Sequence, residues 1–332
     1  MTFWIVRAEK HGSNEKSAIE KNLITIGWNE LPDLSKIGSK DELKTIYDKK
    51  YGPKSKMHIV NVAGQIWNFA TKIVIGDLVA LPLKISSGIA IGEVTSDYQF
   101  KEIEPSIKHI REVKWLKTFP RSAFDQDILN SLGAFLTVGK VRADNAEARV
   151  QSMLSGKIHR VKDEEIDVES SELDLEQYSK DHIIKLLERK FKNHGLERLI
   201  NEILIAKGYT TKLSPAGADE GVDILAGSGT LGFESPKICV QVKSSNNPID
   251  VTVVRELEGV MKNFKADHGL LVAWNGITKN AEDETKRAFF SIRVWNQENI
   301  VDEIMKNYEN FGDTMKAELP LKKTFYVDGT ET

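Results

Sequence analysis

The stretch Gly217–Lys243 reads GADEGVDILAGSGTLGFESPKICVQVK, and it decides how the fold of the second half of the chain is interpreted. Asp223 stands at the start of one apolar run, and a second apolar run begins at Ile238. Three glycines and one proline lie between the two runs. Apolar runs separated by such turn residues are typical of neighbouring strands. The stretch therefore predicts two strands, with Asp223 at the entrance of the first.

Polar and apolar side chains alternate along the second predicted strand. Gln241 and Lys243 alternate with Val240 and Val242. Successive side chains of a strand point to opposite faces, so Gln241 and Lys243 share one face. If the two strands pair, Asp223 lies beside Gln241. A carboxylate, an amide oxygen and an ammonium then surround one point.

This set of groups suits phosphodiester hydrolysis. Mg²⁺ takes oxygen ligands and often uses only one or two protein carboxylates. We expect Asp223 to be the main metal ligand, Gln241 to bind through its side-chain oxygen, and the carbonyl of Val242 to complete the set. Lys243 would position the attacking water or stabilise the growing negative charge. The expected cofactor is Mg²⁺, with Mn²⁺ as an alternative.

A simpler interpretation of the same residues is an edge strand with a solvated polar face. Burying an ammonium without a partner is costly, and a salt bridge from Asp223 to Lys243 would avoid that cost. Cys239 is expected to be a buried structural thiol. The spacing alone favours the salt bridge, and the flanking sequence is what favours a nuclease site.

That flanking sequence resembles the Mrr-type restriction endonucleases, a branch of the PD-(D/E)xK nuclease superfamily. The resemblance covers nearly all of residues 185–310. It rests on LERLINEILIAKGY (196–209), GADEGVDILAG (217–227), CVQVKSS (239–245), VRELEGVM (254–261) and GLLVAW (269–274). The chain departs from the family at Glu220, where the family often has Gly, and at Asn275, which interrupts a Gly-rich stretch.

The resemblance implies roles for particular residues. The family uses Gln where most of the superfamily has Glu or Asp, so Gln241 would be catalytic together with Asp223 and Lys243. Glu197 would be the helical acidic residue that supports the metal site, and Glu202 is a weaker candidate for the same role.

The order of elements in the second half predicts an α/β restriction-endonuclease-like fold, a central mixed sheet flanked by helices. Strands are expected at 222–225, 238–243, 269–273 and 292–294. Helices are expected at 178–192, 195–207, 251–264, 280–289 and 298–309.

The first half is rich in short strand-like runs, and it predicts a mixed α+β barrel. Strands are expected at 3–6, 23–26, 78–83, 88–94 and 113–116, and helices at 41–47, 57–70 and 145–153. IGDLVALPLKISSGIAIGEVTSDYQF (75–100), followed by HIREVKW (109–115), resembles EVE and PUA-like barrels over roughly residues 1–120. That group includes readers of modified bases, which hold a flipped base in an aromatic pocket.

Candidate pocket and DNA-contacting residues follow from that resemblance and from local charge. A pocket needs aromatic faces for stacking and polar groups for the base edge. The expected pocket residues are Trp28, Asn29, Trp67, Ser86 and Asp97. The expected contacts with the DNA backbone are Arg111, Lys114, Ser244 and Arg255. For each tryptophan, ordinary core packing is the alternative.

An acidic segment divides the chain. Lys162–Glu176 reads KDEEIDVESSELDLE and holds eight acidic residues and one basic residue, which is typical of a solvated linker or of an acidic first helical turn. We expect a sensing domain at 1–160, an acidic linker at 161–177, a nuclease domain at 178–312 and a C-terminal tail at 313–332.

Composition sets the remaining limits. The chain has 332 residues and a net charge of −3, so a nuclease must rely on a local basic surface. Its single cysteine excludes a disulfide framework and a Cys-rich zinc site. The N-terminus lacks the apolar core of a signal peptide and no run approaches a membrane span, so we expect a cytoplasmic protein with no membrane partner.

Together these patterns predict a modification-dependent, type IV-like DNA endonuclease. Its partner would be double-stranded DNA that carries modified bases, and cutting both strands would require a homodimer or a higher assembly. Two alternatives remain open. The first domain would instead sense a small nucleotide or a protein trigger in phage defence, or the chain would be a catalytically silent nucleic-acid-binding module.

Overall fold

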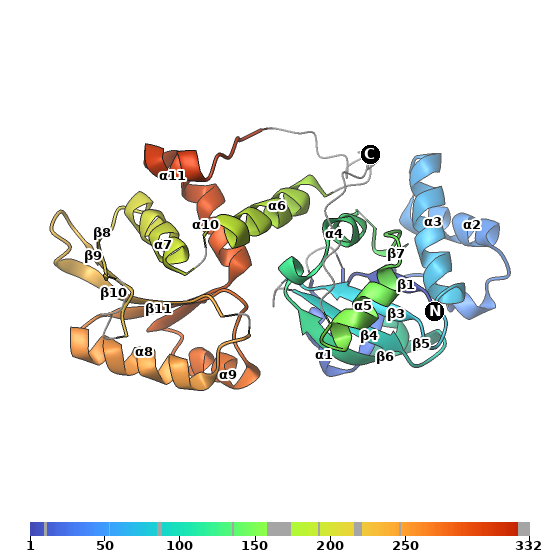
Figure 1. Ribbon diagram of the computed structural model, residues 1–332. Helices are drawn as coiled ribbons and strands as arrows, with labels where there is room; N and C mark the ends of the chain where they lie inside the picture. The colour runs from blue at the N-terminus through green and yellow to red at the C-terminus, as the bar shows by residue number, and fades with distance from the viewer. Residues whose placement is uncertain are drawn as a thin grey trace. The chain divides into compact units, whose positions relative to one another are not determined.

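The computed structural model describes residues 1–9, 12–52, 54–84, 88–134, 136–157, 174–191, 193–215, 221–245 and 247–324. The chain divides into two compact units (Figure 1). The N-terminal unit runs to Tyr178, and the C-terminal unit begins at Ser179. No helix in the described ranges is long and apolar enough to cross a membrane.

The C-terminal unit is built on a mixed sheet of five strands in the order β12-β11-β10-β9-β8. These strands are β8 (Thr210–Leu213), β9 (Ile224–Ser228), β10 (Glu234–Lys243), β11 (His268–Ala273) and β12 (Ile292–Trp295). β10, β11 and β12 are parallel, whereas β8, β9 and β10 are antiparallel. The end of β10 and the start of β9 therefore meet at one edge of the sheet.

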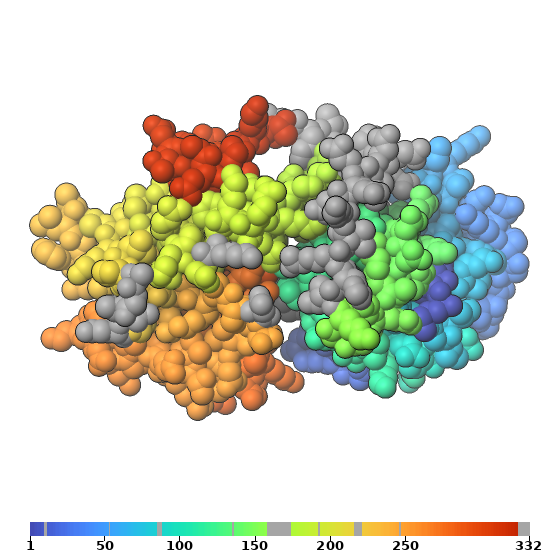
Figure 2. Space-filling view, viewed as in Figure 1, coloured from blue at the N-terminus to red at the C-terminus, as the bar shows by residue number. Residues whose placement is uncertain are grey.

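Helices cover both faces of this sheet (Figure 1). One face packs against α6 (Leu175–Lys190), α7 (His194–Ala206), α10 (Gln297–Asn307) and α11 (Asp313–Glu318). The other face packs against α8 (Val251–Phe264) and α9 (Lys279–Arg287). The atoms of these last two helices form one continuous orange face in the space-filling view (Figure 2). The predicted α/β sheet flanked by helices is confirmed for this unit.

Two elements of the C-terminal unit differ from expectation. Strand β8 was missed because its residues are mostly exposed and show no alternation of apolar and polar side chains. The segment expected to be a tail from residue 313 begins with α11, whose Met315 is buried, and Leu319 after it is fully buried. Leu319 packs in the same hydrophobic core as residues of α6 and α10, so this segment is part of the folded unit.

The N-terminal unit holds a seven-stranded sheet in the order β2-β6-β4-β3-β1-β7, with β5 also paired to β6. Its strands are β1 (Phe3–Val6), β2 (Leu23–Ile26), β3 (Leu78–Pro82), β4 (Ile89–Val94), β5 (Gln99–Glu104), β6 (Ile107–Phe119) and β7 (Val138–Lys140). Its helices are α1 (Glu15–Glu20), α2 (Lys40–Tyr51), α3 (Lys56–Thr71), α4 (Gln126–Leu132) and α5 (Ala146–Leu154).

The expected closed barrel is not seen among the described strands. β2 and β7 end the pairing order, and no described pair joins them. The reason lies in how β1 is buried. Trp4 and Val6 pack with α2 and α3, whereas Phe3 and Ile5 pack with α4 and α5. Because helices cover both faces, the sheet buries its apolar residues without closing on itself.

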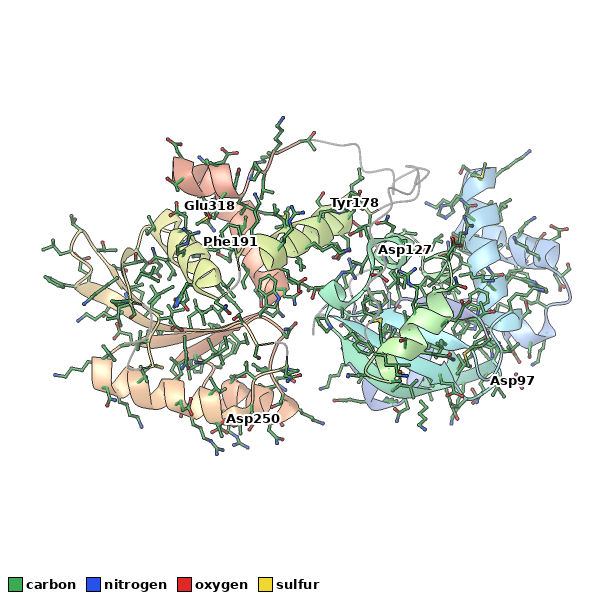
Figure 3. The ribbon with its side chains drawn as sticks, in the orientation of Figure 1. Asp97, Asp127, Tyr178, Phe191, Asp250 and Glu318 are labelled. Atoms are coloured by element: carbon green, nitrogen blue, oxygen red, sulfur yellow. The ribbon has the colours of Figure 1, made fainter. Side chains whose placement is uncertain are left out.

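The acidic linker falls mostly outside the described residues, since 158–173 are not described. Asp174 follows them and accepts a hydrogen bond from the N–H of Gln177 at the start of α6 (3.0 Å). Phe191, which directly follows α6 and is labelled in Figure 3, packs in the hydrophobic core of the C-terminal unit.

Candidate active site

Asp223 is held by the backbone just before β9. Its N–H donates to the carbonyl of Val240 (2.9 Å), and its carbonyl accepts from the N–H of Ser214 (2.9 Å). Its side chain is buried, and Oδ2 accepts a hydrogen bond from the N–H of Val242 across 2.5 Å. A charged acceptor strengthens such a bond, so the carboxylate is fixed at the edge where β9 begins and β10 ends.

Gln241 brings an unsatisfied oxygen to the same place. Ile224 lies opposite Val240, so Asp223, the preceding residue, lies beside Gln241. The Gln241 side chain is only 4% exposed, and its buried Oε1 has no hydrogen-bond partner among the residues that the structure describes. Leaving a buried acceptor unpaired costs about 1–3 kcal/mol. The oxygen therefore has capacity for a ligand that the described residues do not supply.

The backbone of Val242 presents a second oxygen to this edge. In a strand, the N–H and carbonyl of one residue point to the same side. The N–H of Val242 points to Asp223, so its carbonyl points to the same edge. The next carbonyl, that of Lys243, points the opposite way and accepts from the N–H of Trp274 (3.0 Å).

Lys243 does not form the salt bridge of the simpler interpretation. Within the described ranges, its ammonium has no ion pair and no hydrogen bond, and its side chain is partly exposed. It shares a face of β10 with Gln241 and with Cys239, which is fully buried. Burial raises the pKa of the Cys239 thiol to about 11, in agreement with a structural role.

Glu197 lies in the first turn of α7 and contacts a histidine of the same turn. Its Oε2 lies 2.7 Å from Nδ1 of His194, and its side chain is 15% exposed. The hydrogen bond and charge of Glu197 raise the pKa of His194, and the charge of Asp223 adds to this effect. Ser244, the residue after Lys243, donates through Oγ to Oδ1 of Asn193 at the start of α7 (3.3 Å).

Glu202, the weaker candidate for the helical acid, has a different contact. Its Oε1 accepts from the N–H of Gly312 (2.5 Å), directly before α11. A carboxylate at a helix start satisfies a free N–H and offsets the helix dipole. Glu202 therefore fixes α11 and lies away from the candidate site.

The donor set fits a hard divalent cation. It offers a buried carboxylate, an unpaired amide oxygen and a strand carbonyl, and Mg²⁺ accepts all three. No group of three His, Cys, Asp or Glu side chains suited to a metal occurs among the residues described.

Residues 188–304 match the Mrr_cat family, described as restriction endonuclease. The C-terminal unit therefore carries a restriction endonuclease domain, which implies a nuclease. Enzymes of this family generally use divalent metal ions. Residues 4–135 match a domain of unknown function, DUF8426, so the EVE and PUA-like resemblance gains no support from this comparison. A search of curated proteins finds no match.

Several solved structures show similarity to the chain, and three of them are restriction enzymes. The MspJI restriction endonuclease, in complex with a 27-mer oligonucleotide, is 14% identical with a TM-score of 0.32, over 74% of this chain and 64% of that one. The DNA modification-dependent restriction endonuclease AspBHI is 15% identical with a TM-score of 0.33, over 81% and 74%. The DNA-bound, ATP-dependent Type ISP restriction-modification enzyme LlaBIII is 18% identical with a TM-score of 0.24, over 37% and 8%.

The expected pocket residues of the N-terminal unit lie in different settings. Trp28 and Trp67 are half-buried against the core of α2 and α3. The side-chain amide of Asn29 is hydrogen-bonded to the backbone. Its Nδ2 donates to the carbonyl of Ser106 (2.7 Å), and its Oδ1 accepts from the N–H of Lys108 (3.1 Å). Asp97 is exposed, as Figure 3 shows, and Ser86 lies outside the described residues.

Arg111 is a correction to the expected DNA contacts. It is 2% exposed, and its guanidinium donates to the carbonyls of Phe69 (2.8 Å), Ala70 (3.0 Å) and Ser96 (3.2 Å). Two of these bonds, to Phe69 and Ala70, satisfy carbonyls at the end of α3 that have no partner within the helix. A buried guanidinium with three carbonyl partners does not meet a phosphate.

The other three expected DNA contacts stay on the surface. Lys114 is exposed on β6, and Ser244 is exposed after β10. Arg255 is 61% exposed but pairs with Glu284 on α9 (3.2 Å), so part of its charge is already compensated.

Sequence reasoning missed a buried histidine network next to Trp28. Nε2 of His109 donates to the carbonyl of Trp28 (3.1 Å), and Nδ1 accepts from the hydroxyl of Tyr98 (2.7 Å), which in turn accepts from the N–H of Leu34 (3.2 Å). A carbonyl only accepts, so Nε2 carries the proton. Burial lowers the pKa of His109 to about 4 and keeps the ring neutral. No sequence pattern marks this position.

Proposed function

We propose that the chain is a Mg²⁺-dependent endonuclease that cleaves double-stranded DNA and acts on DNA carrying modified bases. The observation that carries the proposal is the buried, unpaired Oε1 of Gln241 beside the fixed carboxylate of Asp223. This pair lies within the segment that matches the restriction endonuclease family.

A divalent cation at this site would polarise the scissile phosphate and lower the pKa of water. Asp223, Gln241 and the carbonyl of Val242 would hold it. The N–H of Val242 keeps one oxygen of Asp223 in place, so the ligand is oriented before the cation binds. Because Lys243 has no partner among the described residues, its ammonium is available to orient a water or to donate to a phosphate oxygen.

Glu197 supplies a second negative charge at the same edge. Its one described side-chain hydrogen bond is to His194, through Oε2, so Oε1 can accept from a water or approach the cation. Gln241 contributes no charge, so the site carries one anionic group fewer than a site with Glu at that position. Glu197 therefore contributes more to the binding of a divalent cation than it would in a site with Glu in place of Gln241.

We place base sensing in the N-terminal unit, at the half-buried ring of Trp28. Tyr47 and Tyr51 pack on the same core and stack with their ring centroids 4.9 Å apart. An aromatic face offsets the cost of unstacking a flipped base, which is a few kcal/mol. Since the amide of Asn29 is already used, it holds the turn that carries Trp28 rather than reading the base edge.

The proposal is tested by cleavage of modified phage DNA and unmodified plasmid DNA, each with Mg²⁺, with Mn²⁺ and with EDTA. Asp223→Asn keeps the shape of the side chain and removes its charge. Glu256→Gln, on the exposed side of α8, is the matched control for loss of a carboxylate. We expect metal-dependent cleavage by the wild type and by Glu256→Gln, and none by Asp223→Asn.

The outcomes separate the parts of the proposal. No cleavage by the wild type under any metal contradicts the nuclease assignment. Equal cleavage by Asp223→Asn contradicts the site. Equal cleavage of the two DNAs contradicts base sensing alone, and leaves a nuclease whose N-terminal unit responds to something else. Sedimentation with and without DNA tests the expected dimer.

A further inference from the structure

His194 lies beside Glu197, one of the two acidic residues proposed for the nuclease site. It is the first residue of α7, and Glu197 follows three residues later on the same helix face. Its Nδ1 lies 2.7 Å from Oε2 of Glu197. The charge of Asp223, far away in sequence, also acts on the His194 ring.

The start of α7 is tied to the end of the catalytic strand. Asn193 precedes the helix with a positive φ of 49°, which Asn adopts more often than most residues. Ser244 donates to the Asn193 side chain and so links this turn to the residue after Lys243. The Ser244–Asn193 hydrogen bond therefore holds the start of α7, and with it His194, close to the end of β10. This contact uses neither ring nitrogen of His194.

The hydrogen bond specifies how the pair is arranged. A carboxylate accepts, so Nδ1 carries a proton, whichever state Nε2 is in. One oxygen of Glu197 is held, and free rotation of its side chain is removed. Nothing in the described residues binds Nε2, and the side chain is 61% exposed.

We propose that His194 is a positioning residue of the nuclease site, which acts by holding the carboxylate of Glu197 in the orientation that the metal site requires. This inference rests on the proposed function. Hydrogen bonds from a second layer of residues orient metal-site groups, and their loss typically costs 10- to 100-fold in metal affinity or activity. A surface pair of the ordinary kind would contribute almost nothing.

The test compares three substitutions of His194 in the full chain. His194→Ala removes both nitrogens. His194→Asn places an amide N–H near the position of Nδ1, and His194→Gln places one near that of Nε2. Lys286→Ala breaks an exposed i,i+4 pair with Glu282 on α9 and is the control. The readouts are Mn²⁺ affinity, from the electron paramagnetic resonance signal of free Mn²⁺, and the kcat and KM for DNA.

We expect His194→Ala to weaken Mn²⁺ binding about 10-fold or more and to lower kcat with little change in KM. His194→Asn should recover most of the loss, and His194→Gln should not. In a Glu197→Gln background, His194→Ala should have no further effect, because the group it holds is already changed. Lys286→Ala should match the wild type.

Three results would overturn the proposal. If His194→Ala bound Mn²⁺ as tightly as the wild type, the His194–Glu197 hydrogen bond would be an ordinary surface contact with no role in metal binding. Rescue by His194→Gln instead of His194→Asn would show that the ring acts through Nε2 on DNA. A full additional loss in the Glu197→Gln background would show that His194 does not act through Glu197. The Mn²⁺ titration requires no cleavage, so failure of the proposed nuclease activity would be seen separately.

Discussion

The N–H of Val242 and the carboxylate of Asp223 form a 2.5 Å hydrogen bond across the edge of the C-terminal sheet. The bond joins Val242 of β10 to the residue just before β9 and brings three oxygens to this edge, those of Asp223, Gln241 and the Val242 carbonyl. It also accounts for how a buried carboxylate is tolerated before any cation binds, because a charged acceptor needs a donor.

Asp223→Asn should abolish cleavage and leave the fold intact. The amide keeps the shape but removes the charge that holds a dication, an interaction worth several kcal/mol. The expected loss in kcat is about 100-fold or more. Single-turnover cleavage at saturating Mg²⁺ measures it, and an unchanged urea midpoint is the control. Activity within about threefold of the wild type would remove Asp223 from the site.

Gln241→Met should stabilise the metal-free protein while inactivating it. The substitution keeps the length of the side chain and removes the buried oxygen that has no partner. The free energy of unfolding should rise by about 1 kcal/mol or more in EDTA. Mn²⁺ binding should weaken, and cleavage should be lost. A less stable variant in EDTA would mean that the oxygen has a partner in solution.

Gln241→Glu should have the opposite effect on metal binding. It adds an anionic ligand beside Asp223, so Mn²⁺ affinity should rise about 10-fold. Without metal, two close buried carboxylates repel each other and raise the pKa of the new carboxyl, so stability should fall as pH rises above the ordinary Glu value of about 4.3. Calorimetric titration with Mn²⁺ measures the change in metal affinity, and urea unfolding in EDTA measures the change in stability with pH. Unchanged affinity would show that residue 241 does not touch the cation.

Acid should destabilise the N-terminal unit through His109. The folded pKa is about 4, below the usual value of 6.5 for the unfolded chain, so the unfolded state takes up the proton first as pH falls. The stabilisation is fully present above pH 6.5 and is lost between pH 6.5 and 4. The loss is on the order of 3 kcal/mol over this window. Urea unfolding, monitored by tryptophan fluorescence at several pH values, should show it.

His109→Gln is the matched variant for this pH dependence. Its side chain does not titrate in the same window, so the slope of unfolding free energy against pH should be smaller than in the wild type. An equal slope in both proteins would assign the effect to other groups.

Arg111→Met should destabilise the protein without acting on DNA directly. Three carbonyls, including those of Phe69 and Ala70 at the end of α3, would lose their donor. The expected loss is about 3 kcal/mol or more. Lys114→Met, on the exposed face of β6, should change stability by less than about 0.5 kcal/mol. DNA affinity measured well below the melting temperature should fall for Lys114→Met alone. The reverse pattern would restore Arg111 as a DNA contact.

The sequence predicted the local elements of the C-terminal unit well because each depends on neighbouring residues. Helix α8 has the predicted bounds, and the alternation in β10 placed Gln241 and Lys243 on one face. Apolar periodicity is set by the geometry of helix and strand, which is the same in every protein. The strands β1 and β2 have the predicted bounds for the same reason.

The arrangement of the N-terminal sheet was not predictable in this way. Every residue of β1 is buried, so its pattern does not distinguish a barrel wall from a sheet covered by helices on both faces. The local basic charge around Arg111 predicts a DNA contact at this residue. Only its distance from the end of α3 in the folded chain shows that it caps that helix.

By itself, the sequence determined the set of chemical groups: an aspartate before one strand, a glutamine and a lysine on one face of the next, and the helix that carries Glu197. The tertiary structure decided how these groups are used. Among the described residues, it left the Gln241 oxygen unpaired, gave Asp223 the N–H of Val242 in place of the Lys243 ammonium, and set His194 against Glu197. The physical reason is that hydrogen bonding and burial depend on neighbours from separate segments, and strand and helix periodicity do not encode which segments meet.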